Sequence, residues 1–78
     1  MNELKQQVID YWLKSYKAKR WPFIQRLMIA KALGRNINIA LRELAKEKKV
    51  ILKRSINDVL VVYVGDKQIL NEFKHYIN

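Results

Sequence analysis

The 78-residue sequence has no cysteine, one histidine, one proline and two glycines. Without cysteine, the chain forms no disulfide and has no thiol redox chemistry. No apolar run approaches the roughly 20 residues that a membrane-spanning helix needs, and residues 1–5 do not lead into the apolar stretch of a signal peptide. We therefore expect one small cytoplasmic domain with no membrane partner.

Groups that carry catalysis are also scarce. His75 is the only histidine, and the hydroxyl candidates Ser15 and Ser55 have no base near them in sequence. There is no glycine-rich phosphate loop and no set of metal ligands. A metal-dependent nuclease needs acidic ligands, and the middle of the chain offers only Glu43 and Glu47. The sequence predicts a non-enzymatic protein without metal or cofactor.

Acidic residues are few, and positive charge is concentrated in one region. The chain has 16 Lys and Arg against 7 Asp and Glu, a net charge of +9. Residues 11–57 contain 13 basic and 2 acidic residues, a local charge of +11, whereas residues 1–10 and 58–78 each carry −1. Such a distribution is typical of a surface that binds phosphates. Lysines that serve only solubility are the alternative, but they do not explain the slightly acidic ends.

Apolar periodicity divides the chain into helices at 2–20, 22–33 and 36–49, a β-hairpin at 50–64 and a last helix at 66–77. Pro22 suits a first helical turn because its missing N–H needs no partner there. Gly34 suits the left-handed position that ends a helix. Asn36 or Asn38 can cap the third helix, and Asp66 can cap the last one.

The stretch IAKALG (29–34), followed by INIALRELAKEKKVI (37–51) and a hairpin, resembles the winged helix-turn-helix family. The resemblance implies an α+β fold of three helices, a β-hairpin wing and a C-terminal helix, with 36–49 as the recognition helix for duplex DNA. One departure is the tight turn Gly34-Arg35-Asn36, which leads almost directly into Ile37. It leaves open whether the third helix or the wing dominates DNA contact.

The third helix has one apolar side and one side suited to base reading. Placing Ile37 at 0°, helical geometry brings Ala40, Leu41, Leu44 and Lys48 within about 60° of it as a core stripe. The opposite side then carries Asn38, Ile39, Arg42, Lys46 and Lys49, and it excludes Glu43 and Glu47.

These side chains have distinct expected roles. Asn pairs with adenine and Arg with guanine in the major groove, so Asn38 and Arg42 are the predicted base contacts. Ile39 suits a thymine methyl, and Lys46 and Lys49 suit phosphates. Arg35 and Asn36 lie where a helix start meets backbone or base edges. An ordinary solvated helix face is the alternative, since capping alone explains one asparagine.

The hairpin supplies further candidates for DNA contact: Lys53, Arg54, Ser55 and Asn57. Basic residues there suit a narrow minor groove, although such residues are also common beside turns without any function. Trp12, Trp21 and the tyrosines have a spacing that favours core packing over a base-stacking platform for single strands.

The expected assembly is a homodimer built from the terminal helices, because the first helix is apolar over roughly 200°. It would place two recognition elements about 34 Å apart on DNA. A monomer whose last helix covers its own core is the alternative. The expected role is transcription regulation or plasmid or phage accessory work, resembling relaxosome components at origins of transfer, with other DNA-processing or transcription proteins as partners. A protein–protein module or a non-specific nucleic-acid binder using the same basic face remains the alternative function.

Overall fold

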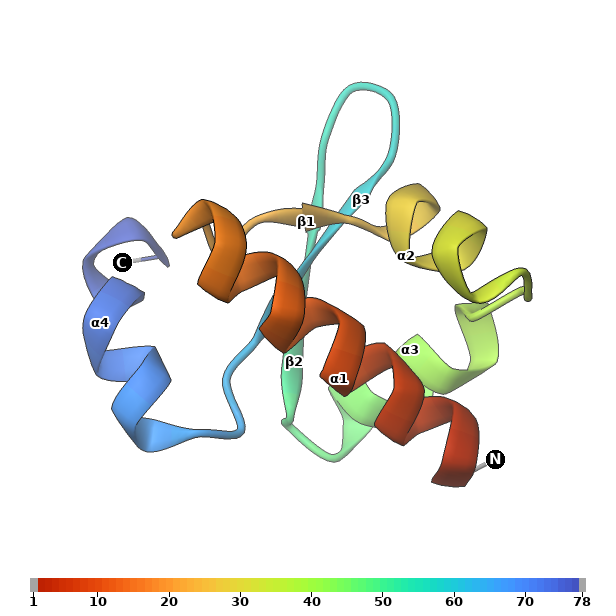
Figure 1. Ribbon diagram of the computed structural model, residues 1–78, viewed down its shortest axis with the longest axis horizontal. Coiled ribbons are helices and arrows are strands. Elements are labelled where there is room, and N and C mark those ends of the chain that lie inside the picture. The colour runs from red at the N-terminus through yellow and green to blue at the C-terminus, as the bar shows by residue number, and fades with distance from the viewer. Residues whose placement is uncertain (1, 78) are drawn as a thin grey trace.

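The computed structural model describes residues 2–77 and is an α+β structure with a three-stranded antiparallel sheet (Figure 1). Along the chain the elements are α1 (Asn2–Lys19), β1 (Ile24–Gln25), α2 (Arg26–Leu33), α3 (Asn38–Lys46), β2 (Val50–Arg54), β3 (Val59–Tyr63) and α4 (Lys67–Ile77). The strand order in the sheet is β1-β3-β2. This arrangement is compatible with a winged helix-turn-helix.

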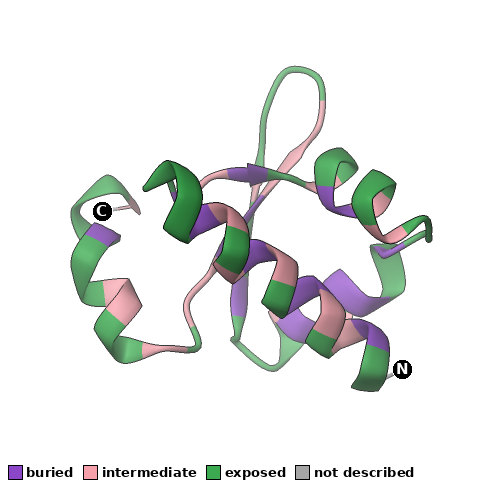
Figure 2. Cartoon of the chain, viewed as in Figure 1, coloured by how far each residue is buried: buried purple, intermediate pink, exposed green. Residues whose placement is uncertain are grey.

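The first helix runs through the middle of the fold, which explains its wide apolar arc. It buries residues from successive turns and packs against α2, α3, β1 and β3 (Figures 1 and 2). Trp12 is fully buried, and its indole N–H donates to the carbonyl oxygens of Val61 at 2.8 Å and Pro22 at 3.1 Å. Trp12 thus joins α1 to the central strand and to the segment before β1.

The last helix covers the core of its own chain. Phe73 is buried, and its ring centroid lies 5.9 Å from that of Trp12 and 5.5 Å from that of Tyr16. Asp66 Oδ1 accepts hydrogen bonds from the backbone N–H groups of Gln68 and Ile69, which confirms Asp66 as the cap of α4. The apolar face of α1 is therefore largely buried within one chain, whereas on α4 only Phe73 is buried and Ile69, Leu70 and Ile77 are partly buried. Dimerisation stays a prediction.

The expected helix at 22–33 is wrong in its first turn. Pro22 is buried in a loop, and Ile24–Gln25 form β1, which pairs with β3 in the register Ile24↔Val61. The edge of β3 offers unpaired backbone groups, and a β-branched residue with a buried side chain suits that edge better than a helix start. The helix begins at Arg26 and ends as predicted, with Gly34 in the left-handed conformation at φ 65°.

The third helix is shorter than the expected 36–49. Its core stripe is confirmed, since Ile37, Ala40, Leu41 and Leu44 are all buried. The helix ends at Lys46, however, and Lys48 is exposed with φ 62°. The chain must turn into β2 by Val50, so Lys48 takes a left-handed turn position instead of the predicted place at the edge of the helix stripe.

The aromatic residues divide between core and surface. Trp12 and Tyr16 are buried as predicted, but the expected core packing is wrong for Trp21, which is 46% exposed, and for Tyr76, which is 49% exposed. The Trp21 ring instead makes edge contacts with Phe23 and Tyr76, at centroid distances of 5.4 and 5.2 Å. Pro22 occupies the buried position beside Trp21 and leaves the indole outside.

Candidate nucleic-acid interface

The solvent-facing side of α3 carries the side chains that the sequence places there. Asn38, Ile39, Arg42 and Lys46 are all exposed, while the other side of the helix is buried. Lys49 does not share this face, because α3 ends three residues earlier. Its ammonium nitrogen lies 3.6 Å from a carboxylate oxygen of Glu47, so its charge is partly engaged within the protein.

A lysine of α1 forms ion pairs with both acids near α3. Lys5 Nζ lies 2.6 Å from Glu47 Oε2 and 3.6 Å from Glu43 Oε1. The hydrogen bond to Glu47 raises the pKa of Lys5, and the same bond lowers the pKa of Glu47. The sequence analysis did not single out Lys5, since no local spacing links it to Glu47, 42 positions away. These acids therefore oppose an approaching phosphate less than their charge suggests.

A cleft of about 430 Å³ separates α3 from the β2–β3 hairpin. Its apolar lining comes from both elements: Leu41, Ala45, Leu52 and Val59. Its polar lining includes Asn38 and Arg42, the two predicted base contacts. The cleft thus brings the proposed reading residues of the helix beside the hairpin.

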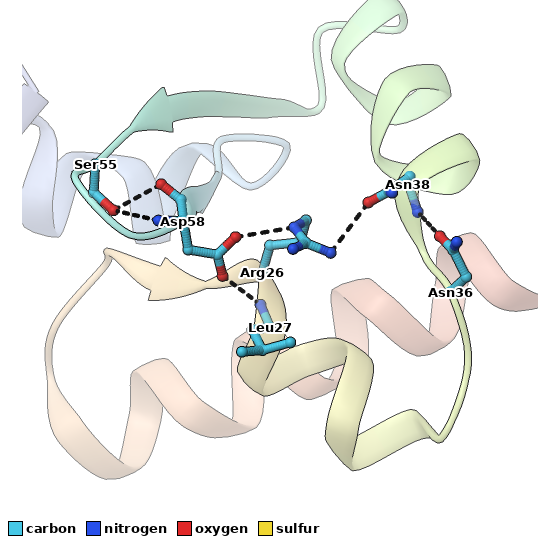
Figure 3. A network of polar contacts seen from close by, with 6 residues as sticks. All are labelled: Arg26, Leu27, Asn36, Asn38, Ser55 and Asp58. Atoms are coloured by element: carbon cyan, nitrogen blue, oxygen red, sulfur yellow. Dashed lines mark hydrogen bonds and ion pairs between the residues drawn. The ribbon is translucent and has the colours of Figure 1, made fainter.

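A polar network ties the hairpin tip to the starts of α2 and α3 (Figure 3). Asp58 Oδ1 accepts from Arg26 Nε at 3.0 Å, and Asp58 Oδ2 accepts from the backbone N–H of Leu27 at 2.8 Å. Arg26 Nη1 donates to Asn38 Oδ1 at 3.3 Å. Asn36 Oδ1 accepts from the backbone N–H of Asn38 at 2.9 Å and closes the turn before α3. The N-cap position of α3 is Ile37, so the expected cap at Asn36 or Asn38 is wrong.

The Asp58 carboxylate is nearly buried, with 9% of its side chain exposed. Burial opposes its ionisation, but hydrogen bonds from the N–H groups of Leu27 and Val59 and the nearby charge of Arg26 outweigh burial, so the pKa of Asp58 is lowered. Gln25, at the N-cap of α2, makes no side-chain capping bond. Asp58 therefore caps α2 from the hairpin, a role for which the sequence carries no local signal.

The predicted hairpin residues do not all face the cleft. Arg54 is exposed. Successive side chains of a strand point to opposite faces of the sheet, so Arg54 shares a face with Leu52, two residues before it, which lines the cleft. Lys53 lies on the other face, where its Nζ is 5.9 Å from the centroid of the Phe23 ring. The structure therefore separates Lys53 from α3.

The hairpin tip spans residues 55–58. Ser55 Oγ donates to the Asp58 carbonyl at 2.7 Å and accepts from its N–H at 3.2 Å, so this hydroxyl closes the tip. Asn57 is exposed. Ile56, which sequence reasoning passed over, is 99% exposed at the outermost turn. Arg35 is exposed in the turn between α2 and α3, where its N–H bonds to Ala30 O.

Other kinds of site find little support in the part of the chain that the structure describes. Between residues 2 and 77 no three His, Asp or Glu side chains gather where they could hold a metal ion. None of the four described helices combines the length and apolarity that crossing a membrane requires. Compared with known proteins, the chain matches no protein-family model, no curated protein and no solved structure.

Proposed function

We propose that this protein is a winged helix-turn-helix protein that binds duplex DNA at specific sequences and catalyses no reaction. In this proposal α2 and α3 form the helix-turn-helix, α3 enters the major groove, and the β2–β3 hairpin is the wing. The proposal rests mainly on α3: its exposed side combines Asn38, Arg42 and Lys46, and the acid within the helix, Glu43, is held by Lys5.

The expected contacts follow from the positions of these side chains. Arg42 reads guanine with its planar guanidinium, and Lys46 holds a phosphate. Arg54 and the exposed tip residues Ile56 and Asn57 approach the adjacent groove. Lys53 lies on the opposite face of the sheet from the cleft, so we assign it to flanking backbone alone.

We also propose a dimer, since operators read by two recognition helices need half-sites about 34 Å apart. The aromatic residues left half-exposed, Trp21 and Tyr76, are the apolar surface that such a dimer would cover. A monomer mass at tens of micromolar in analytical ultracentrifugation contradicts this part of the proposal. Transcription regulation and plasmid or phage accessory work both stay proposals. Each role would use the same DNA-binding surface, so that surface does not distinguish between them.

The test of DNA binding is selection from a random-sequence duplex library, followed by titration of the winning duplex across salt. Wild type, Arg42→Ala and Lys67→Ala are compared, with Lys67 as an exposed lysine outside the proposed interface. We expect an enriched motif, a steep salt slope, and in Arg42→Ala a loss of about 1–3 kcal/mol with relaxed preference at one position. The Lys67→Ala protein should keep the motif.

Two other outcomes are informative. A motif that survives Arg42→Ala moves sequence reading from α3 to the hairpin. Wild-type protein that enriches no sequence contradicts specific binding, and it favours a non-specific or protein-docking role for the same basic face.

A further inference from the structure

The hairpin tip carries one apolar side chain that nothing in its own chain covers. Ile56 has 99% of its surface exposed. The other exposed large apolar residues between positions 2 and 77 have 37–58% of their surface exposed, so the protein still covers part of each. Burial of an isoleucine side chain is favourable. Ile56 is therefore suited to an apolar environment that another molecule provides.

The turn that carries Ile56 is closed by hydrogen bonds and fixed to α2. The Ser55 N–H donates to the Asp58 carbonyl at 2.8 Å, and Ser55 Oγ bonds to both the N–H and the carbonyl of Asp58. The Asp58 carboxylate accepts from Arg26 and from the N–H of Leu27 at the start of α2. The hairpin extends beyond the helices (Figure 1). Ile56 is thus held outward at a defined place relative to the helix-turn-helix.

Basic side chains flank the tip on both faces of the hairpin. Arg54 lies on the cleft face, and Lys53 lies on the opposite face beside the Phe23 ring. The one acid of residues 50–64, Asp58, is nearly buried and paired with Arg26. An apolar tip between two cations is complementary to stacked bases that lie between two phosphate backbones. The charge around Ile56 therefore favours a nucleic acid as the molecule that covers it.

We propose that Ile56 is an apolar wedge that enters the minor groove beside the α3 site and kinks the DNA. Minor-groove proteins frequently insert an apolar side chain, isoleucine among them, between base pairs, which partly unstacks them and kinks the duplex by about 20–90°. This inference rests on the proposed function and adds DNA deformation to sequence reading by α3. Pyrimidine–purine steps (TA and CA/TG) unstack most easily. We therefore expect one such step at a fixed distance from the selected motif.

The first test measures DNA shape at saturating protein, so that differences in affinity do not enter. Duplexes with the selected motif and its flanks carry a fluorophore at each end, and energy transfer reports the end-to-end distance. Wild type is compared with Ile56→Ser, which removes the apolar wedge, and with Ile56→Leu, which keeps one. The matched control is Ile51→Ser, because Ile51 is an exposed isoleucine of the same hairpin, in β2 and away from the tip. Circular dichroism checks that each protein is folded.

The expected result separates the tip from the rest of the hairpin. Wild type, Ile56→Leu and Ile51→Ser should bend the duplex by at least about 20°. The Ile56→Ser protein should lose at least half of that bend, because a serine hydroxyl gains nothing from the apolar space between two base pairs.

The second test locates the unstacked step in the wild-type complex, and so stands even if a variant fails to fold. Each flexible pyrimidine–purine step contains a thymine on at least one strand. Permanganate oxidises thymine from the face of the ring, which stacking protects. We expect a several-fold increase in permanganate reactivity at one thymine beside the motif when wild type binds. The increase should be absent in the Ile56→Ser complex.

The outcomes separate the wedge from the proposed function. Wild type that binds its motif without bending it, or without a reactive thymine, overturns the wedge and leaves DNA binding standing. A bend that survives Ile56→Ser in full, or that is lost equally in Ile56→Leu or Ile51→Ser, does the same. If wild type enriches no motif from the duplex library, the proposed function fails and the wedge fails with it.

Discussion

Removing the Asp58 carboxylate should destabilise the whole domain, because that group caps α2 and pairs with Arg26 from the hairpin tip. Loss of a helix cap costs about 1 kcal/mol. A hydrogen bond to a charged group is worth about 1.5–3 kcal/mol, and we take the lower part of that range because Arg26 is partly exposed. Asp58→Ala should therefore lower the free energy of unfolding by about 2–3 kcal/mol.

The assay is thermal and urea unfolding at pH 7, followed by circular dichroism. For a domain of this size, 1 kcal/mol corresponds to roughly 4–8 °C in Tm, so we expect Asp58→Ala to lower Tm by roughly 10–20 °C. Asp58→Asn keeps an oxygen for the N–H of Leu27 and loses the charge, so its effect should be about half as large. Asp10→Ala is the matched control, since Asp10 is exposed and accepts a side-chain hydrogen bond from the neighbouring Gln6 of the same helix.

The pH dependence gives an independent check. The folded-state pKa of Asp58 is lowered, so its contribution is fully present above the ordinary aspartate pKa of about 3.9. It is lost as pH falls through the lower folded-state value. The stability difference between wild type and Asp58→Ala should be constant from about pH 5 to 8 and shrink below about pH 4. A Tm change no larger than that of Asp10→Ala, or a difference that persists in acid, refutes this account of Asp58.

Three further substitutions test local features. Gly34 has φ 65° and open space around a Cβ, so Gly34→Ala should cost about 1 kcal/mol in urea unfolding from backbone conformation alone. Lys48 has φ 62°, so Lys48→Gly should instead raise stability by about 0.5 kcal/mol. If the two variants changed the free energy of unfolding in the same direction, the left-handed geometry would be contradicted. Ile56 is 99% exposed, so Ile56→Ser should leave Tm unchanged and weaken DNA binding several-fold in fluorescence anisotropy. Unchanged affinity would remove the hairpin tip from the interface.

Local periodicity was enough to predict several elements. The hairpin at 50–64 holds because β-branched residues run on either side of a polar tip, and the observed strands pair Val50 with Tyr63 and Arg54 with Val59. The core stripe of α3 holds because its apolar residues repeat with the helical period. These features depend on neighbours within a few residues, which the sequence displays directly.

The two-residue strand β1 had no comparable signal. Ile24 and Gln25 are too few to show alternation, and Pro22 just before them favours a helix start. Their conformation is set by pairing with the edge of the distant strand β3, where Ile24 lies opposite Val61 and Gln25 opposite Leu60. Because β1 forms only by pairing with a strand far along the chain, its own two residues could not predict it.

The candidate site shows the same division between local and distant causes. The helical period predicted that Asn38 and Arg42 face solvent, and both do. It could not predict that Asn38 Oδ1 accepts a hydrogen bond from Arg26, because Arg26 is held by Asp58 at a separation of 32 residues. Residue type therefore defines what an exposed side chain is able to donate or accept. If α3 reads DNA as proposed, the tertiary network around α3 sets how these groups are presented, and substitutions in that network should change DNA binding without touching DNA.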